Sequence, residues 1–296
     1  MSEDLERSQD RLDNIQAIDP ILGALRTISM GSWQLALKRR SNVQNYRMHF
    51  ADIYEAILPL LKNHFGPVHE KKSSVQKIAT IVVGSERGLI GKFNRDIVDH
   101  SAKYLEELQR NGMQSDMYLL GSRISRFFNQ QNITYRSLTP LSTTSLPSFE
   151  VAAKMTHTLL IQYEANQIDA ADMIYTSYQG PSNYKIEIDR IIPYQPKRLR
   201  RIQQHMRTWP PAIVETDPIR LYTQLVKQET AIHFYELLLD SAAAEHSARF
   251  QLLEEATQNA QRLIEELNLA VQMTRRQTIT REMQELAVGS GMLNKP

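Results

Sequence analysis

The chain has 296 residues, with 35 Lys or Arg against 33 Asp or Glu, so its formal net charge is only +2. This balance leaves no general field that would attract nucleic acid or an anionic membrane. The absence of cysteine excludes disulfides and thiolate metal sites. The N-terminus is charged and no apolar run reaches transmembrane length, so we expect a cytosolic-type protein without direct membrane insertion.

A long N-terminal helix is predicted over residues 3–63, because apolar residues recur at steps of three and four, the spacing of a helix that packs along another helix. The predicted seam consists of Ile18, Ile21, Leu25, Ile28, Ser32, Leu35, Tyr46, Phe50, Ile53 and Ile57. Asp19-Pro20 interrupts it, and proline lacks an N–H and clashes with the preceding turn. We therefore expect a kink or a restart there, with Asp19 as N-cap. Gly66-Pro67 closes this first region, residues 1–66.

The middle of the chain, residues 75–213, alternates short apolar runs with amphipathic stretches. Strands are expected at 77–84, 117–121, 171–178 and 184–193, and helices at 94–111, 124–131 and 148–166. Strands that alternate with helices indicate a mainly parallel sheet covered on both faces. The middle region is therefore predicted to be a Rossmann-like α/β domain.

The last region, residues 217–293, has no proline after Pro218 and no glycine before Gly289. Its predicted seam is Leu253, Ala256, Ala260, Leu263, Leu267 and Ala270. Seventy helical residues would span roughly 105 Å, so this helix needs a partner along its length. The predicted fold is α/β, with long N- and C-terminal helices in an antiparallel left-handed coiled coil and a Rossmann-like domain inserted between them.

The C-terminal seam changes character over Gln272–Thr278, which reads Gln-Met-Thr-Arg-Arg-Gln-Thr. Apolar spacing then resumes at Ile279, Met283, Leu286 and Leu293. A solvated break in the coil is one interpretation. The other is a polar collar that contacts another protein, since arginine stays charged and donates several hydrogen bonds.

No catalytic, cofactor or metal site is expected. The loop Gly84–Gly91 has Glu86 where phosphate-binding motifs require glycine, so Gly88 and Gly91 are interpreted as turn and packing glycines. The histidines form no ligand pair at i and i+4, and His246 is expected to be packed or hydrogen-bonded beside Glu245 and Arg249. The basic run Lys197–Arg201 favours a solvated linker over a nucleic-acid site.

Several segments resemble one family. Residues 239–250, 256–260 and 279–289 resemble the gamma subunit of F-type ATP synthases, and Ser85–Asn94 is similar to that family's first strand-to-helix turn. The likeness is spread, in order, over residues 78–293. Asp19-Pro20, Arg276 and Ser290 depart from the family pattern and indicate a divergent member.

The resemblance implies a non-catalytic central rotor, or shaft, that lies inside an alpha–beta hexamer. It would couple ion flow through a membrane c-type ring to ATP synthesis or hydrolysis, with an epsilon-type subunit as a further partner. It would be peripheral at the cytoplasmic face of the plasma membrane. The expected interface residues are Arg275, Arg276, Gln277, Ile279, Thr280, Glu282, Met283 and Leu286 at the shaft end, and Arg87 and Lys92 on the foot.

Two other function classes remain open from the sequence. One is a stand-alone α/β binding module with a coiled-coil arm, which would not co-purify with alpha and beta subunits. The other is an enzyme that uses Gly84–Gly91, which requires nucleotide binding by the isolated chain.

Overall fold

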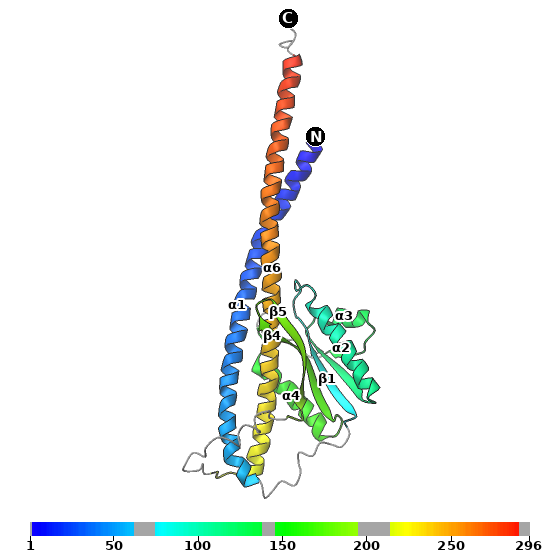
Figure 1. Cartoon of the computed structure of the whole chain (residues 1–296), viewed down its shortest axis with the longest axis vertical. Helices are drawn as coiled ribbons and strands as arrows, with labels where there is room; N and C mark the ends of the chain where they lie inside the picture. The colour runs from blue at the N-terminus through cyan, green and yellow to red at the C-terminus, as the bar shows by residue number, and fades with distance from the viewer. Residues whose placement is uncertain (1, 62–74, 138–145, 195–213, 290–296) are drawn as a thin grey trace. The chain divides into compact units, whose positions relative to one another are not determined.

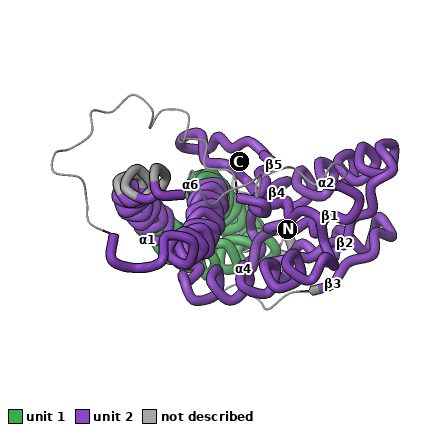
Figure 2. The backbone as a smooth tube through the Cα atoms, turned by 90° about the horizontal axis from the view of Figure 1, so that it is seen from below, with its two compact units in different colours: residues 1–29, 250–296 green, residues 30–249 purple. Residues whose placement is uncertain are grey.

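The computed structural model describes residues 2–61, 75–137, 146–194 and 214–289 (Figure 1). Contacts divide the chain into two compact units. The smaller comprises residues 1–29 and 250–296, and the larger comprises residues 30–249 (Figure 2). Helix α1 spans Ser2–Leu61 and helix α6 spans Pro218–Gly289. These two long helices confirm the predicted terminal elements.

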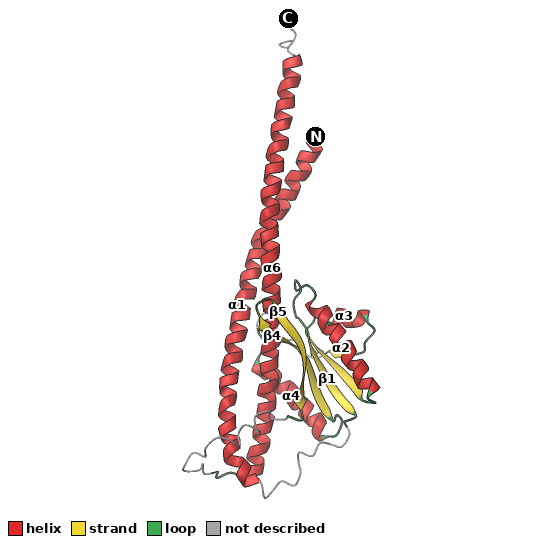
Figure 3. Cartoon of the chain, viewed as in Figure 1, coloured by secondary structure: helices red, strands yellow, loops and turns green. Residues whose placement is uncertain are grey.

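The larger unit contains a five-stranded sheet in the order β3-β2-β1-β4-β5. Figure 3 shows the strands of this sheet in yellow beside the long helices. Its elements, in chain order, are β1 Lys77–Val83, α2 Phe93–Arg110, β2 Gln114–Leu120, α3 Ser125–Gln130, β3 Arg136–Ser137, α4 Phe149–Glu164, β4 Ala170–Gly180 and β5 Asn183–Ile192. The first four strands are parallel, and β5 returns antiparallel beside β4. The mainly parallel sheet is therefore confirmed, with β3 as a short edge strand that the sequence did not indicate.

Both faces of the sheet are covered, because successive strand residues point to opposite sides. On one face, Ile81 and Met173 pack with residues of α4 and α6, including Leu159 and Phe234. On the other face, the neighbouring strand residues Val82, Leu119 and Ile174 pack with residues of α2 and α3. This two-sided burial explains why the strands are almost continuous apolar runs.

In the larger unit, α1 and α6 run antiparallel and side by side (Figures 1 and 3). Ile57 and Leu61 near the end of α1 share an apolar cluster with Tyr222 and Leu225 near the start of α6. Further along, Ala36 lies in a cluster with Ala242 and Ala243. The antiparallel pairing is confirmed, while the left hand of the coil stays a prediction from the heptad spacing.

The face of α1 that meets α6 agrees with the predicted seam only at Phe50 and Ile57. The stripe on this face falls at Ser29, Ala36, Val43, Phe50 and Ile57, each seven residues apart, with Val43 partly buried and the others buried. Predicted seam residues Ile18, Ile21, Ile28, Leu35, Tyr46 and Ile53 are exposed. The sequence prediction chose these residues because they are strongly hydrophobic. The face that contacts α6 instead includes the small residues Ser29 and Ala36, which let two helices pack closely. It also uses arginines that pair across the helices.

α1 continues through Asp19-Pro20, so the expected alternative of a restart with Asp19 as N-cap is wrong, while a kink near Pro20 stays a prediction. Asp19 lies inside the helix, and its Oδ1 atom is buried without a hydrogen-bond partner in the described part of the chain. Helical residues on both sides of the proline pack in the smaller unit: Leu12 is buried, and Arg26 forms an ion pair with Glu254 at 2.9 Å. These contacts hold the helix across the one backbone bond that proline removes.

The seam of α6 also continues where a break was expected. The predicted seam residues Leu263 and Ala270 are exposed, and the partly buried positions include Ile264, Leu267, Val271, Thr274 and Thr278. The two threonine hydroxyls donate to the carbonyls of Ala270 and Thr274, at 2.9 and 3.0 Å. Threonine can satisfy its hydroxyl within the helix in this way and still turn its methyl group to the seam. The seam therefore becomes polar in composition without breaking.

Candidate functional site

The end of α6 exposes the predicted collar. Arg275, Arg276 and Gln277 all lie on its exposed surface. Among the described residues, neither arginine forms an ion pair, whereas Arg281 on the same helix pairs with Glu285 at 2.9 Å. The two guanidinium groups are thus available to an acidic or polar partner.

Beyond the collar, α6 carries an exposed apolar stripe. Ile279, Met283 and Leu286 recur at steps of four and three on one helix face, and the last two are 66% and 73% exposed. With Ile279 at 50% exposure, all three side chains are at least half exposed, so no other described part of the chain covers this stripe. Thr280 and Glu282 are also exposed. Exposed apolar side chains that gather on one face are typical of interaction surfaces, and a partner contact at this stripe stays a prediction.

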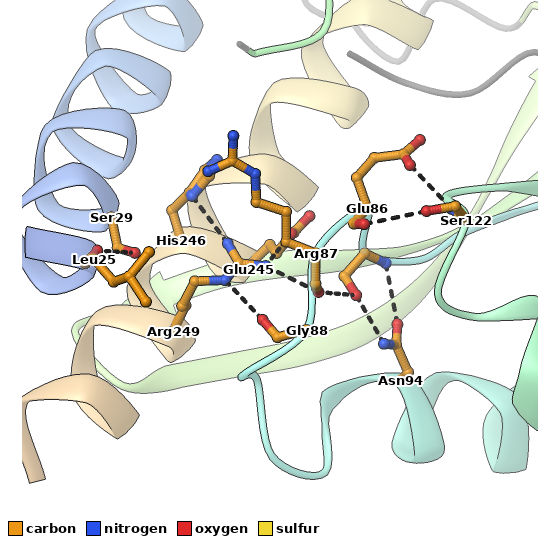
Figure 4. A network of polar contacts seen from close by, with 11 residues as sticks. Leu25, Ser29, Glu86, Arg87, Gly88, Asn94, Ser122, Glu245, His246 and Arg249 are labelled. Carbon is orange, nitrogen blue, oxygen red and sulfur yellow. Dashed lines mark hydrogen bonds and ion pairs between the residues drawn. The ribbon is translucent and has the colours of Figure 1, made fainter. Parts of the chain in front are cut away.

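The loop between β1 and α2, in the larger unit, is closed by its own polar contacts (Figure 4). Asn94 Oδ1 accepts the backbone N–H of Ser85 at 3.0 Å, and its Nδ2 donates to Ser85 Oγ at 2.7 Å. Glu86 accepts the N–H of Ser122, just after β2, at 3.1 Å, so its side chain fastens the loop to the neighbouring strand end and places a carboxylate where a phosphate would be repelled. Gly91 has a φ of +59°, which supports its turn role, while a Cβ at Gly88 would meet no atom within 4 Å. Gly88 is therefore no packing glycine.

Arg249 of α6 fastens this loop (Figure 4). It is only 5% exposed. Its Nε donates to the carbonyl of Gly88 and its Nη2 to the carbonyl of Arg87, both at 3.2 Å. Nη2 also meets Glu245 at 2.5 Å. The Arg87 backbone is thus held, while the side chains of Arg87 and Lys92 lie on the exposed surface of the larger unit.

His246 accepts a hydrogen bond in the same network, as its position in the sequence predicted. Its Nδ1 lies 3.1 Å from Nη1 of Arg249. Burial lowers the pKa of His246 to about 3, and the positive charges of Arg249 and Arg87 act in the same direction. Burial raises the pKa of Glu245, and the charge of Arg249 opposes that rise. Sequence reasoning missed the loop carbonyls, although a Glu245–Arg249 pair inside an apolar seam was a usable signal.

The neutral His246 gives a testable pH dependence. Its folded pKa lies below the ordinary value of 6.5, so between pH 6.5 and about 3 the unfolded chain binds the extra proton. The free energy of unfolding should then fall with decreasing pH, by about 1.4 kcal/mol per pH unit from this group. Urea unfolding at several pH values measures this dependence. The free energy of unfolding should change less steeply with pH in His246→Gln than in the wild type. The raised pKa of Glu245 makes the free energy of unfolding rise as pH falls, and it does so in both the wild type and the variant. Equal pH dependence of the two proteins would therefore contradict a neutral His246.

The described residues contain no group of three or more His, Asp or Glu side chains placed to hold a metal ion. Nor does any helix within them meet the length and hydropathy needed to cross a membrane. What the structure does provide is a sheet domain fastened to two long helices, one of which ends in an uncovered polar and apolar surface. This arrangement defines an interaction protein with an extended helical arm.

The comparisons with known proteins name the family. The family model described as ATP synthase matches residues 4–293, so the chain belongs to that family. It is 24% identical to the ATP synthase gamma chain of Cytophaga hutchinsonii over 297 residues, covering 98% of this chain and 99% of the relative. It is also 24% identical to the gamma chain of Campylobacter concisus over 288 residues, covering 94% and 95%. The resemblance to gamma chains is thereby confirmed at the low identity expected of a divergent member.

Solved structures agree on the fold. A chain of the Euglena gracilis mitochondrial ATP synthase, in a structure of OSCP, F1 and c-ring, superposes with a TM-score of 0.66 at 15% identity, covering 99% of this chain and 95% of that chain. A chain of the rotor from the same source gives a TM-score of 0.62 at 14% identity, with 94% and 100% covered. Long terminal helices with an inserted α/β sheet are therefore the shared architecture.

Proposed function

We propose that this chain is the central rotor shaft of a rotary ATP synthase and performs no chemistry itself. The observation that carries the proposal is the end of α6, where two exposed arginines and an uncovered apolar stripe follow each other on one continuous helix. The collar of Arg275, Arg276 and Gln277 would meet acidic or polar loops of surrounding alpha and beta subunits. The tip beyond it would turn in an apolar sleeve, where contacts lack strong direction.

Differential contact would couple rotation to nucleotide turnover. An asymmetric shaft favours a different conformation in each catalytic subunit around it. Turning the shaft then changes nucleotide affinity in each subunit, and by linkage nucleotide turnover turns the shaft. The catalytic groups belong to the partner subunits in this mechanism.

The α/β domain, residues 75–213, would be the foot of the rotor, and residues 1–66 and 217–293 would be its shaft. Arg87 and Lys92 are exposed on the foot and are candidates for contact with the c-type ring and an epsilon-type subunit. In a bacterial cell this would place the chain, as a peripheral subunit, at the cytoplasmic face of the plasma membrane.

Co-expression with alpha and beta subunits from the same organism tests the proposal. We expect a complex that co-purifies and hydrolyses ATP, with activity that depends on this chain. A chain that remains alone, or a hexamer whose ATPase rate is the same without it, would favour the stand-alone binding module instead.

The exposed stripe of α1 should be a second contact with the surrounding subunits. Ile21 and Ile28 are 58% and 52% exposed and stand seven residues apart on one face. Burying such a side chain is worth about 1.5–3 kcal/mol, so Ile21→Asp/Ile28→Asp should weaken assembly with alpha and beta subunits at least about tenfold. Titration of the hexamer with the purified chain measures this affinity.

Gln34→Asp/Ser41→Asp is the matched control, since it adds the same two negative charges at other exposed positions of α1, also seven residues apart. It should leave the affinity unchanged, and neither protein should change in thermal unfolding. If Ile21→Asp/Ile28→Asp bound the hexamer with the same affinity as the wild type, the exposed stripe of α1 would not be part of the interface.

A further inference from the structure

A row of polar residues on α6 faces the α/β domain within the larger unit. Glu229, His233, Glu236 and Asp240 follow each other at steps of four, three and four, the spacing of one helix face. Asp240 is the most buried of the three carboxylates, at 3% exposure. Carboxylates are rarely this buried unless they are paired, so the partners of Asp240 show which elements of the fold it connects.

Asp240 connects three elements of the fold. Its Oδ1 forms an ion pair with Nη1 of Arg40, on α1, at 2.9 Å. Its Oδ2 accepts a hydrogen bond from Ser177 Oγ at 3.1 Å, and Oδ1 accepts the backbone N–H of Tyr178 at 3.3 Å. One side chain of α6 is therefore bonded to α1 and to β4.

The contact falls where β4 leaves its neighbour in the sheet. β1 pairs with β4 only as far as Ile174, and the β4–β5 register shifts between Tyr178 and Gly180. Asp240 supplies an acceptor to this irregular end of the strand. The ring of Tyr178 also packs against Trp33 of α1, with centroids 5.9 Å apart. Both long helices thus hold the end of β4.

The rest of the row repeats this arrangement. Arg47 of α1 forms ion pairs with Glu229 and Glu236 of α6, and it donates to the hydroxyl of Tyr194, just after β5, at 2.9 Å. His233 lies 3.5 Å from the carboxylate of Asp189 on β5. Polar contacts therefore link the helix pair to both β4 and the β5 end of the sheet.

Stability alone does not explain these contacts. Replacing a buried ion pair with apolar residues of similar size is often neutral or stabilising. Apolar packing, however, is non-directional, whereas hydrogen bonds and ion pairs fix distance and angle. Directional bonds resist the sliding of a helix pair against a sheet, which is what a shaft under torque would experience.

We propose that Asp240 is a torque-bearing joint, a positioning residue that locks the α/β domain to both long helices so that a twist applied to the domain reaches the shaft. This role rests on the proposed rotor function. It assigns to the Asp240–Arg40–Ser177–Tyr178 cluster the transfer of torque between foot and shaft, while contacts at the end of α6 would serve the hexamer.

Torsional stiffness of the assembled rotor tests this joint. The chain has no cysteine, so Lys103→Cys at an exposed position of α2 gives a unique attachment point for a bead on the α/β domain. With the alpha–beta hexamer fixed to a surface and the shaft held by a non-hydrolysable nucleotide, the angular variance of the bead reports the compliance between domain and shaft. We expect Asp240→Asn to increase this variance at least about twofold and to lower ATP-driven ion uptake per ATP hydrolysed in proteoliposomes.

Glu254→Gln is the matched control, because it breaks the Arg26 ion pair between α1 and α6 without touching the α/β domain. It should leave the variance unchanged. The apolar pair Arg40→Met/Asp240→Leu separates stiffness from folding: we expect thermal unfolding like that of the wild type together with the increased variance. If the angular variance of the bead in Asp240→Asn and in Arg40→Met/Asp240→Leu equalled that of the wild type, the proposed role of Asp240 would be wrong. A wild-type chain that fails to assemble with the hexamer would instead overturn the rotor function on which it rests.

Discussion

Replacing both Arg275 and Arg276 with alanine is expected to lower the ATPase rate of the assembled complex at least about tenfold. Both guanidinium groups are exposed and have no ion-pair partner among the described residues, so the chain should fold without them. A hydrogen bond to a charged group contributes about 1.5–3 kcal/mol, and losing one that forms only during turnover corresponds to a rate loss of about 10- to 150-fold. Steady-state ATPase assays at saturating ATP measure the effect.

Arg281→Ala is the control for this prediction. Arg281 lies on the same exposed stretch of α6, but its guanidinium pairs with Glu285 of its own helix. Its replacement should change the rate by less than about twofold, because an exposed pair of this kind contributes little. An unchanged rate in Arg275→Ala/Arg276→Ala, or an equal loss in Arg281→Ala, would contradict the collar.

Arg249→Ala should lower the free energy of unfolding by about 3–5 kcal/mol, the cost of removing one partner of a buried ion pair. The substitution leaves Glu245 buried without its cation, and it removes the donors to the Gly88 and Arg87 carbonyls. Urea unfolding of the purified chain measures the loss. The β1–α2 loop should also exchange its amide hydrogens faster, since its fastening to α6 is gone.

A second substitution separates the causes of this loss. Arg249→Ala/Glu245→Gln removes the buried charge and should recover part of the stability. Arg262→Ala, at an exposed ion pair further along α6, should cost less than about 1 kcal/mol. If the double variant were no more stable than Arg249→Ala, the unpaired carboxylate would not be the source of the loss.

Local patterns predicted most of the elements because their signals are local. The β-branched run at residues 77–83 and the absence of helix breakers between Pro218 and Gly289 fix β1 and α6 to within a residue or two. The two-residue strand β3 carries no such pattern. The helix over residues 3–63 was predicted, but its uninterrupted course through Asp19-Pro20 was left open, because packing on both sides outweighs the local preference of proline.

The faces of the long helices were harder to predict than the helices themselves. α1 carries two stripes at heptad spacing, and the more apolar one, with Ile21 and Ile28, is exposed. The contact stripe contains Ser29 and Ala36, whose small side chains bury less apolar surface than the isoleucines of the other stripe. Which stripe faces α6 is decided by shape and by ion pairs to residues more than a hundred positions away, and a single helix pattern contains neither.

The candidate sites divide in the same way. The collar and tip could be proposed from sequence, because a change of composition along one helix is visible there; the structure shows that these residues are exposed, and their contact with partners stays a prediction. The buried contacts of Arg249 and Asp240 were not predicted. Arg249 donates to the carbonyls of Arg87 and Gly88, and Asp240 accepts from the end of β4. Such contacts join residues far apart in the sequence and exist only once the chain has folded. Buried polar residues in a long helix resemble its solvated face until their partners are known.

Direct observation of rotation tests the central claim. The alpha–beta hexamer assembled with this chain is fixed to a surface, and a bead is attached at Lys103→Cys on the α/β domain. The rotor function predicts stepwise rotation in one direction on addition of ATP, at a rate matching the measured ATP turnover. ATP hydrolysis by the assembled complex without rotation of the bead would contradict it.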